Sequence, residues 1–117
     1  MLEIQLNELD RDILRTAQAD LIGVWIAAGA AEAHEPDSSP DELRELVIAS
    51  TRKLLRAQFL RAGDLVRAGF VPWTTSPDES ADRINAKWLE LGRVPNPPES
   101  AWFELTEAGR EAVTGST

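Results

Sequence analysis

The sequence of 117 residues contains no cysteine and no tyrosine, and it has a single histidine. The absence of cysteine excludes disulfide bonds, thiolate zinc sites, iron–sulfur clusters and a cysteine nucleophile. Long apolar runs are missing too: the longest, Leu21–Ala31, is interrupted by two glycines and falls well short of the ~18 residues of a membrane span. No basic start precedes an apolar run at the N-terminus, so no signal peptide is predicted. We therefore expect a cytoplasmic protein of one domain, 1–117.

Basic residues are also few. Twelve Lys and Arg residues stand against 20 Asp and Glu residues, a net charge of −8. Such a charge disfavours broad attraction to nucleic-acid phosphates or anionic membranes. The one basic segment is 43–70, with six basic and two acidic residues. Its arginines either bind nucleic acid or neutralise acidic residues of the same chain, and we favour the second interpretation.

Hydrophobic periodicity and turn residues predict a mainly α, α+β fold in which two strands pair as an antiparallel ribbon packed on the helices. Two helix starts share one pattern, Ser39-Pro40-Asp41-Glu42 and Ser76-Pro77-Asp78-Glu79, in which serine caps the helix and proline opens it. The predicted elements, in the order helix, helix, strand, helix, strand, helix, are 8–33 (a central helix), 40–62, 64–71, 77–91, 101–105 and 107–113.

Two parts of the sequence resemble winged-helix proteins. The stretch Trp102-Phe103-Glu104-Leu105-Thr106-Glu107-Ala108-Gly109-Arg110 is similar to the end of many of them, where the last wing strand runs into a Leu-Thr-Glu-x-Gly-Arg helix start. The passage from Arg52-Lys53-Leu54-Leu55 to Gly63-Asp64-Leu65-Val66 is similar to their helix-to-wing passage. The resemblance spans 40–71 and 101–113. It implies a winged-helix-like fold with 64–71 and 101–105 as wing strands and the helix 77–91 inserted between them.

Most proteins with this pattern bind DNA, which would assign DNA contacts to Arg52, Lys53 and Arg56. The sequence departs from the pattern in two ways. Between Pro40 and Ala62 there is no Gly, Pro or Asn where the turn of a helix-turn-helix could form. The two wing strands are separated by 72–100, which holds a whole helix and five prolines in place of a short basic hairpin. A DNA-binding transcriptional regulator is therefore the alternative function.

Few residues are candidates for catalysis. His34 lies near Glu32, Glu35 and Asp37, a set that could ligate a metal, but a solvated helix end explains these residues more simply. The other acidic groups open helices, where the helix dipole favours them. The sequence has no glycine-rich phosphate loop, dinucleotide fingerprint or His-Glu-x-x-His pattern. We predict no enzymatic activity, no cofactor and no metal.

The favoured hypothesis is a non-enzymatic acidic module that binds a protein with a basic surface, as an immunity protein neutralises a nuclease toxin. Trp25 and Trp88 are predicted in the core, whereas Trp73 and Trp102 are candidates for outward-facing interface aromatics. The sequence is also compatible with a homodimer. The predicted partner-binding residues are Asp37, Asp41, Glu42, Trp73, Asp78, Glu79, Asp82 and Trp102.

Overall fold

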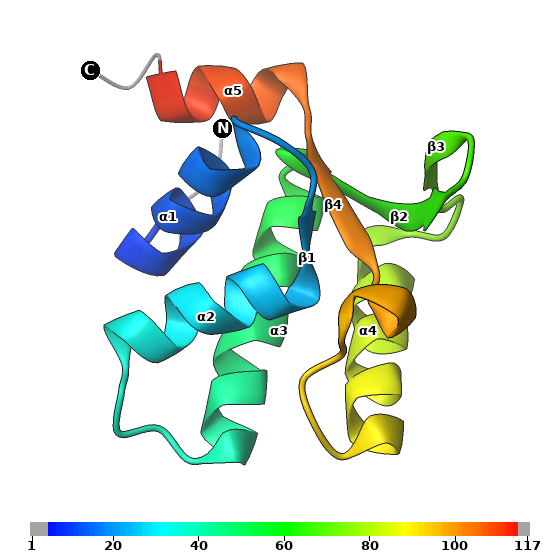
Figure 1. The fold of residues 1–117 in the computed structure, drawn as a ribbon. Coiled ribbons are helices and arrows are strands. Elements are labelled where there is room, and N and C mark those ends of the chain that lie inside the picture. Colours follow the sequence, from blue (N-terminus) through cyan, green and yellow to red (C-terminus); the bar gives the residue numbers. More distant parts are fainter. Residues whose placement is uncertain (1–4, 115–117) are drawn as a thin grey trace.

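The computed structural model describes residues 5–114, and in this range it contains five α-helices, four β-strands and one short 3-10 helix (Figure 1). The helices α1 to α5 are Glu8–Ala17, Val24–His34, Pro40–Arg56, Pro77–Leu91 and Glu107–Thr114. The strands β1 to β4 are Ile22–Gly23, Leu60–Val66, Gly69–Pro72 and Trp102–Leu105, and the 3-10 helix is Pro97–Glu99. Within the described range, no helix has both the length and the apolar composition needed to cross a membrane.

The sheet joins strands that are far apart in the sequence. Its order is β1-β4-β2-β3, and each neighbouring pair is antiparallel. Phe103 in β4 lies opposite Ile22 of β1 on one side and Ala62 of β2 on the other. The predicted α+β class with antiparallel strands is confirmed. The predicted two-stranded ribbon is wrong, because β1 and β3 pair at its edges and make a sheet of four strands.

The predicted central helix over 8–33 is also wrong, because the structure divides it into α1, β1 and α2. Ile22 and Gly23 leave the helix and pair with β4. The amide of Val24, at the start of α2, donates to the hydroxyl of Ser100, 76 positions away in the chain (2.9 Å). These long-range partners satisfy backbone groups that a continuous helix would satisfy internally, so the apolar stretch can break without a local turn signal.

The predicted helix over 40–62 is too long. α3 ends at Arg56, and Gln58 turns the chain with a left-handed backbone (φ 62°). Gly63, just beyond the predicted helix, lies in β2 opposite Trp102 of β4. Pairing with β4 from Leu60 onward therefore outweighs the helical periodicity of these residues.

The predicted strand over 64–71 is in fact parts of two strands. β2 and β3 form a hairpin in which Val66 lies opposite Gly69 and Asp64 lies opposite Val71. Gly69 has a φ of 128°, a conformation that glycine adopts without steric cost, and this allows the tight reversal after Val66.

Two helices begin as the sequence predicts. The Ser39 and Ser76 side chains each accept a hydrogen bond from the amide three residues later, and Glu42 and Glu79 reach back to the serine amides. α4 has the predicted bounds, and it ends at Gly92 with a left-handed backbone (φ 69°). Local capping residues thus predict these boundaries correctly.

The core lies between the inner face of the sheet and the helices. From the sheet, Phe103 and Leu105 contribute to it, and their neighbours on α1 and α3 are buried as well. α4 packs along α3 with its own buried face, which includes Trp88 as predicted. Trp25 is only half-buried, in an edge-to-face contact with Trp102 (centroids 5.0 Å apart), so its predicted place in the core is wrong. Side chains with less than 2 % exposure include Ile13, Leu14, Val24, Val47 and Leu54.

Candidate functional site

The arginines of the basic segment contact acidic residues of α4. Arg52 donates to Asp78 (3.1 Å) and to Asp82 (2.7 Å). Arg56 donates to Asp78 through Nε (2.9 Å). Its hydrogen bond, followed by that of Arg52, lowers the pKa of Asp78. The charges that would serve nucleic-acid binding are therefore engaged within the chain.

Lys53, the third predicted nucleic-acid contact, forms an ion pair with a buried carboxylate. Its Nζ lies 2.7 Å from Oδ2 of Asp10, and Asp10 is fully buried. The Ser50 hydroxyl and the Asn7 amide also donate to this carboxylate. Lys53 therefore holds α3 against α1, a structural role that the charge of the segment alone could not reveal.

The predicted partner-binding acids occupy two separate places. α3 and α4 run antiparallel, since Arg52 contacts Asp78 while Arg44, two turns earlier, contacts Asn85 (2.9 Å). The acids at the start of α4 therefore lie at the far end of the helix pair from those at the start of α3. Asp78 and Asp82 bind the arginines of α3, and Glu79 completes the helix cap. The structure does not bring the two groups together.

Six exposed acids lie close together at the junction of α2 and α3. Two cations lie nearby, Arg44 and Arg93, and Arg44 contacts Asn85 (2.9 Å) and, more loosely, Asp41 (3.5 Å). Three of these acids were missed, because Glu32 and Glu35 were interpreted only as possible metal ligands and Glu45 was counted with the basic segment. The chain reversal between α2 and α3 brings them together. We call this surface the acidic end: Glu32, Glu35, Asp37, Asp41, Glu42 and Glu45, all exposed.

His34 does not join these carboxylates. Its Nε2 contacts Asp12 on α1, and this hydrogen bond is the main cause of the lowered pKa of Asp12. Within residues 5–114, no three or more His, Asp and Glu side chains are arranged to hold a metal ion. The contact instead ties the last turn of α2 to α1.

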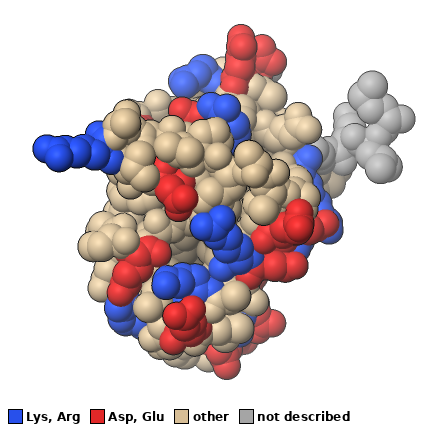
Figure 2. Space-filling view, turned by 90° about the vertical axis from the view of Figure 1, so that its right-hand side faces the viewer, with Lys and Arg blue, Asp and Glu red and all other residues tan. Residues whose placement is uncertain are grey.

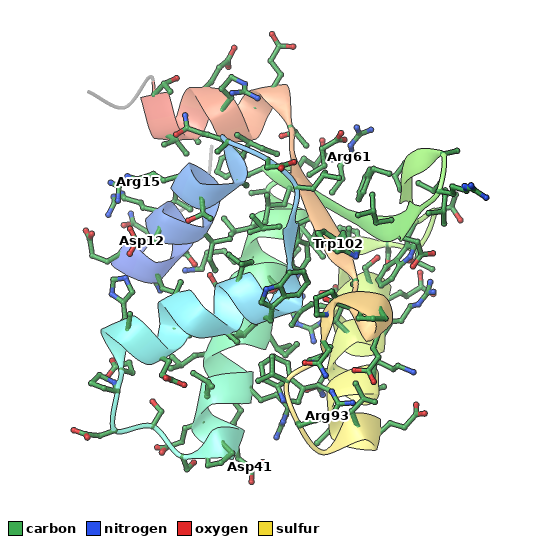
Figure 3. All side chains as sticks on the ribbon, in the orientation of Figure 1. Asp12, Arg15, Asp41, Arg61, Arg93 and Trp102 are labelled. Atoms are coloured by element: carbon green, nitrogen blue, oxygen red, sulfur yellow. The ribbon has the colours of Figure 1, made fainter. Side chains whose placement is uncertain are left out.

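A groove of about 460 Å³ lies beside the acidic end. It is bounded by the start of α3, the last turn of α4 and the loop that follows α4. Figure 3 shows Asp41 and Arg93 at this end of the molecule. Leu89 stands at the groove with 56 % of its surface exposed. The residues that line the groove include Glu32, Asp41, Leu43, Arg44, Trp88, Leu89, Arg93 and Val94.

The two predicted interface tryptophans lie away from the acidic end. Trp102 is on the sheet, half-buried against Trp25. Trp73 follows β3, and the guanidinium of Arg83 stacks 3.8 Å from its ring centroid. Its Nε1 is the one buried side-chain polar atom in the described range without a hydrogen-bond partner. On the side formed by β2, β3 and α4, basic and acidic side chains are interspersed (Figure 2). The eight predicted residues therefore do not form one surface.

The pKa of Glu99 offers a direct test of the charges around the groove. Arg93 binds both oxygens of Glu99 (2.6 and 2.8 Å) and lowers its pKa to about 2. Because the folded pKa is depressed, the stabilisation is complete above the ordinary value of 4.5 and is lost as pH falls through about 2. We expect NMR titration to give a Glu99 pKa near 2, and Arg93→Gln to raise it toward 4.5. Arg110→Gln is the control. An equal rise of the Glu99 pKa in that variant would show that Arg93 is not the cause of the lowered value.

Comparisons with known proteins add no relative: no protein family, curated protein or solved structure matches the chain. The geometry itself therefore carries the functional argument. It presents exposed carboxylates at one end, a largely apolar groove beside them, and the helix α3, whose cations are paired within the chain.

Proposed function

We propose that this protein is a non-enzymatic, winged-helix-like module that binds a basic protein through the acidic end, in the manner of an immunity protein that neutralises a nuclease toxin. The single observation that carries the proposal is the contrast between two parts of α3. Its first turns present three exposed carboxylates, of which only that of Asp41 has an ion-pair partner, while the basic residues of its second half are paired with Asp10, Asp78 and Asp82.

The order of the elements supports the winged-helix-like part of the proposal. β1 lies between α1 and α2 in the sequence and pairs with β4, which in turn pairs with β2. In a winged-helix-like arrangement, α2 and α3 would be the helix-turn-helix pair, with the turn at 35–39. β2 and β4 would be the wing strands, and the hairpin to β3 and helix α4 would be inserted between them.

The same placement argues against DNA as the ligand. In a helix-turn-helix, the N-terminal residues of the recognition helix reach the base edges. In this chain those residues would be Asp41, Glu42 and Glu45, whose charges repel phosphate. Arg52 and Arg56, farther along α3, are held by α4. Transcriptional regulation through DNA remains the alternative, and it requires these contacts to open.

A basic protein suits the acidic end because opposite charges accelerate encounter and discriminate among partners. The carboxylates are held on rigid elements: Glu42 accepts a hydrogen bond from the Ser39 amide, which lowers its pKa and keeps it ionised. A cationic surface such as the nucleic-acid-binding face of a nuclease would meet several fixed charges at once. Covering that face would block the nuclease.

Charge reversal tests the proposal. In Glu32→Lys/Glu45→Lys, two free acids of the acidic end change sign. The matched control Asp64→Lys/Glu111→Lys changes the net charge equally at exposed positions elsewhere. We expect immobilised native protein and the control to capture a basic protein from source-cell extract, and the acidic-end variant to lose it. The purified partner should bind at least tenfold more weakly in 300 mM salt than in 50 mM salt.

Two results would contradict the proposal. The first is equal capture by the acidic-end variant and the control, which would show that these carboxylates make no contact with the partner. The second is a salt-sensitive shift of duplex DNA that weakens in Arg52→Ala/Arg56→Ala, which would favour the DNA-binding alternative.

A further inference from the structure

The groove beside the acidic end presents apolar surface that the fold leaves uncovered. Leu89 is the most exposed large hydrophobic side chain of the described residues (56 %), ahead of Leu65, Val66 and Val71 on the β2–β3 hairpin (43–49 %). Unlike those residues, it borders a concave site, whose other apolar members are Leu43, Trp88 and Val94. Trp88 is itself buried, so its side chain is held in place by the core and gives the groove a rigid apolar surface.

The charges around the groove are asymmetric. Arg44 contacts Asn85 and Asp41, and Arg93 binds both oxygens of Glu99, so the two cations at the groove already have partners. Glu32 has no ion-pair partner in the described range, and the remaining carboxylates of the acidic end continue from this rim. The groove lining holds two acids and two cations, so the net negative charge that an entering group meets comes from the adjoining carboxylates of the acidic end.

We infer that the groove receives an apolar side chain from a basic segment of the partner, with Lys or Arg residues on either side of that anchor. The inference rests on the proposed function and specifies how the partner is recognised. An anionic small molecule would be repelled by the adjoining acidic end. A second copy of this chain would bring a further charge of −8 and its own acidic end against the same carboxylates. A basic amphipathic segment satisfies both features of the site.

The two features contribute differently to recognition. Attraction between charges tolerates many basic sequences and weakens with salt, whereas burial of an apolar anchor depends on shape and resists salt. Covering one leucine-sized side chain and the exposed part of Leu89 should tighten binding about tenfold. The groove would thus separate a true partner from other cationic proteins.

Two synthetic peptides test the inference on the full chain. One is a lysine–leucine peptide of about 14 residues, or about four helical turns, with leucines on one helical face. The other replaces each leucine with alanine, which keeps charge and helix propensity but removes the anchor. We expect the native protein to bind the leucine peptide about tenfold more tightly than the alanine peptide. Leu89→Gln should abolish that preference, while Leu65→Gln, an exposed leucine outside the groove, should keep it.

The outcomes separate the groove from the acidic end. If both peptides bind equally, with affinity lost in Glu32→Lys/Glu45→Lys, the groove takes no anchor and the inference is overturned while the proposed function stands. Equal losses in Leu89→Gln and Leu65→Gln would also overturn it, as evidence of non-specific apolar contact. If neither peptide binds in 50 mM salt, the acidic end has no affinity for basic segments, and the proposed function and the groove fail together.

Discussion

Lys53→Met is expected to lower the free energy of unfolding by about 3 kcal/mol, because it leaves a buried carboxylate without its counter-ion. Asp10 is fully buried, and its Oδ2 lies 2.7 Å from the Lys53 Nζ. Methionine keeps most of the aliphatic stem of lysine but removes the charge. The hydrogen bonds from the Ser50 hydroxyl and the Asn7 amide remain, and they compensate only part of the cost of burying the ion.

Urea unfolding followed by circular dichroism measures this loss. The matched control is Lys87→Met, since Lys87 is exposed and 4.0 Å from Glu90; it should change stability by less than about 0.5 kcal/mol. The double variant Asp10→Asn/Lys53→Met has no unpaired buried charge. Its loss of unfolding free energy should therefore be smaller than the sum of the losses in the two single variants. Equal effects of Lys53→Met and Lys87→Met would show that the ion pair contributes nothing.

Gly109→Ala is expected to destabilise the protein by about 3 kcal/mol, although alanine is normally the better helix former. A Cβ at this position of α5 would lie against the carbonyl oxygen of Phe59, well inside van der Waals contact, and 2.7 Å from Cδ1 of Leu105. The Phe59 oxygen is backbone and also accepts the Thr106 amide (3.1 Å), so it cannot move away cheaply. The substitution therefore separates α5 from the corner between α3 and β2.

Gly29→Ala is the matched control, because a Cβ there would meet nothing within 4 Å. It should stabilise the protein by up to about 1 kcal/mol through helix propensity alone. Thermal unfolding of the two variants should therefore shift in opposite directions. A Gly109→Ala variant as stable as the native protein would show that α5 does not approach the Phe59 carbonyl as closely as described.

The Gly109 contact also explains part of the motif that resembles winged-helix proteins. Thr106 caps α5 by accepting the Gly109 amide (3.0 Å), and its hydroxyl donates to the carbonyl of Gln58 (2.6 Å). Gln58 is the residue with left-handed backbone at the end of α3. Thr106 and Gly109 therefore brace the corner where α3 becomes β2. The sequence predicted that a helix begins directly after Thr106 but not the distant corner that Thr106 holds.

Features that depend on neighbouring residues were predictable from the sequence alone. The serine caps at Ser39 and Ser76, the extent of α4 and the start of α5 at Thr106 all follow from local hydrogen bonding and backbone preference. The uneven distribution of charge along the chain was likewise visible without a structure. These properties need no knowledge of what lies across the core.

Features that depend on distant partners were decided by the tertiary structure. The break after Ala17 required β4 and Ser100, which lie some 80 residues later in the chain. Arg52 and Lys53 find their acidic partners only because α4 and α1 both pack against α3. A charge has the same sign in any fold, so the sequence determined that this chain is acidic with one basic segment. Whether each charge faces solvent or a partner depends on which surfaces meet, and the packing of the helices decided that the arginines of α3 face α4 while six acids stay exposed where α2 meets α3.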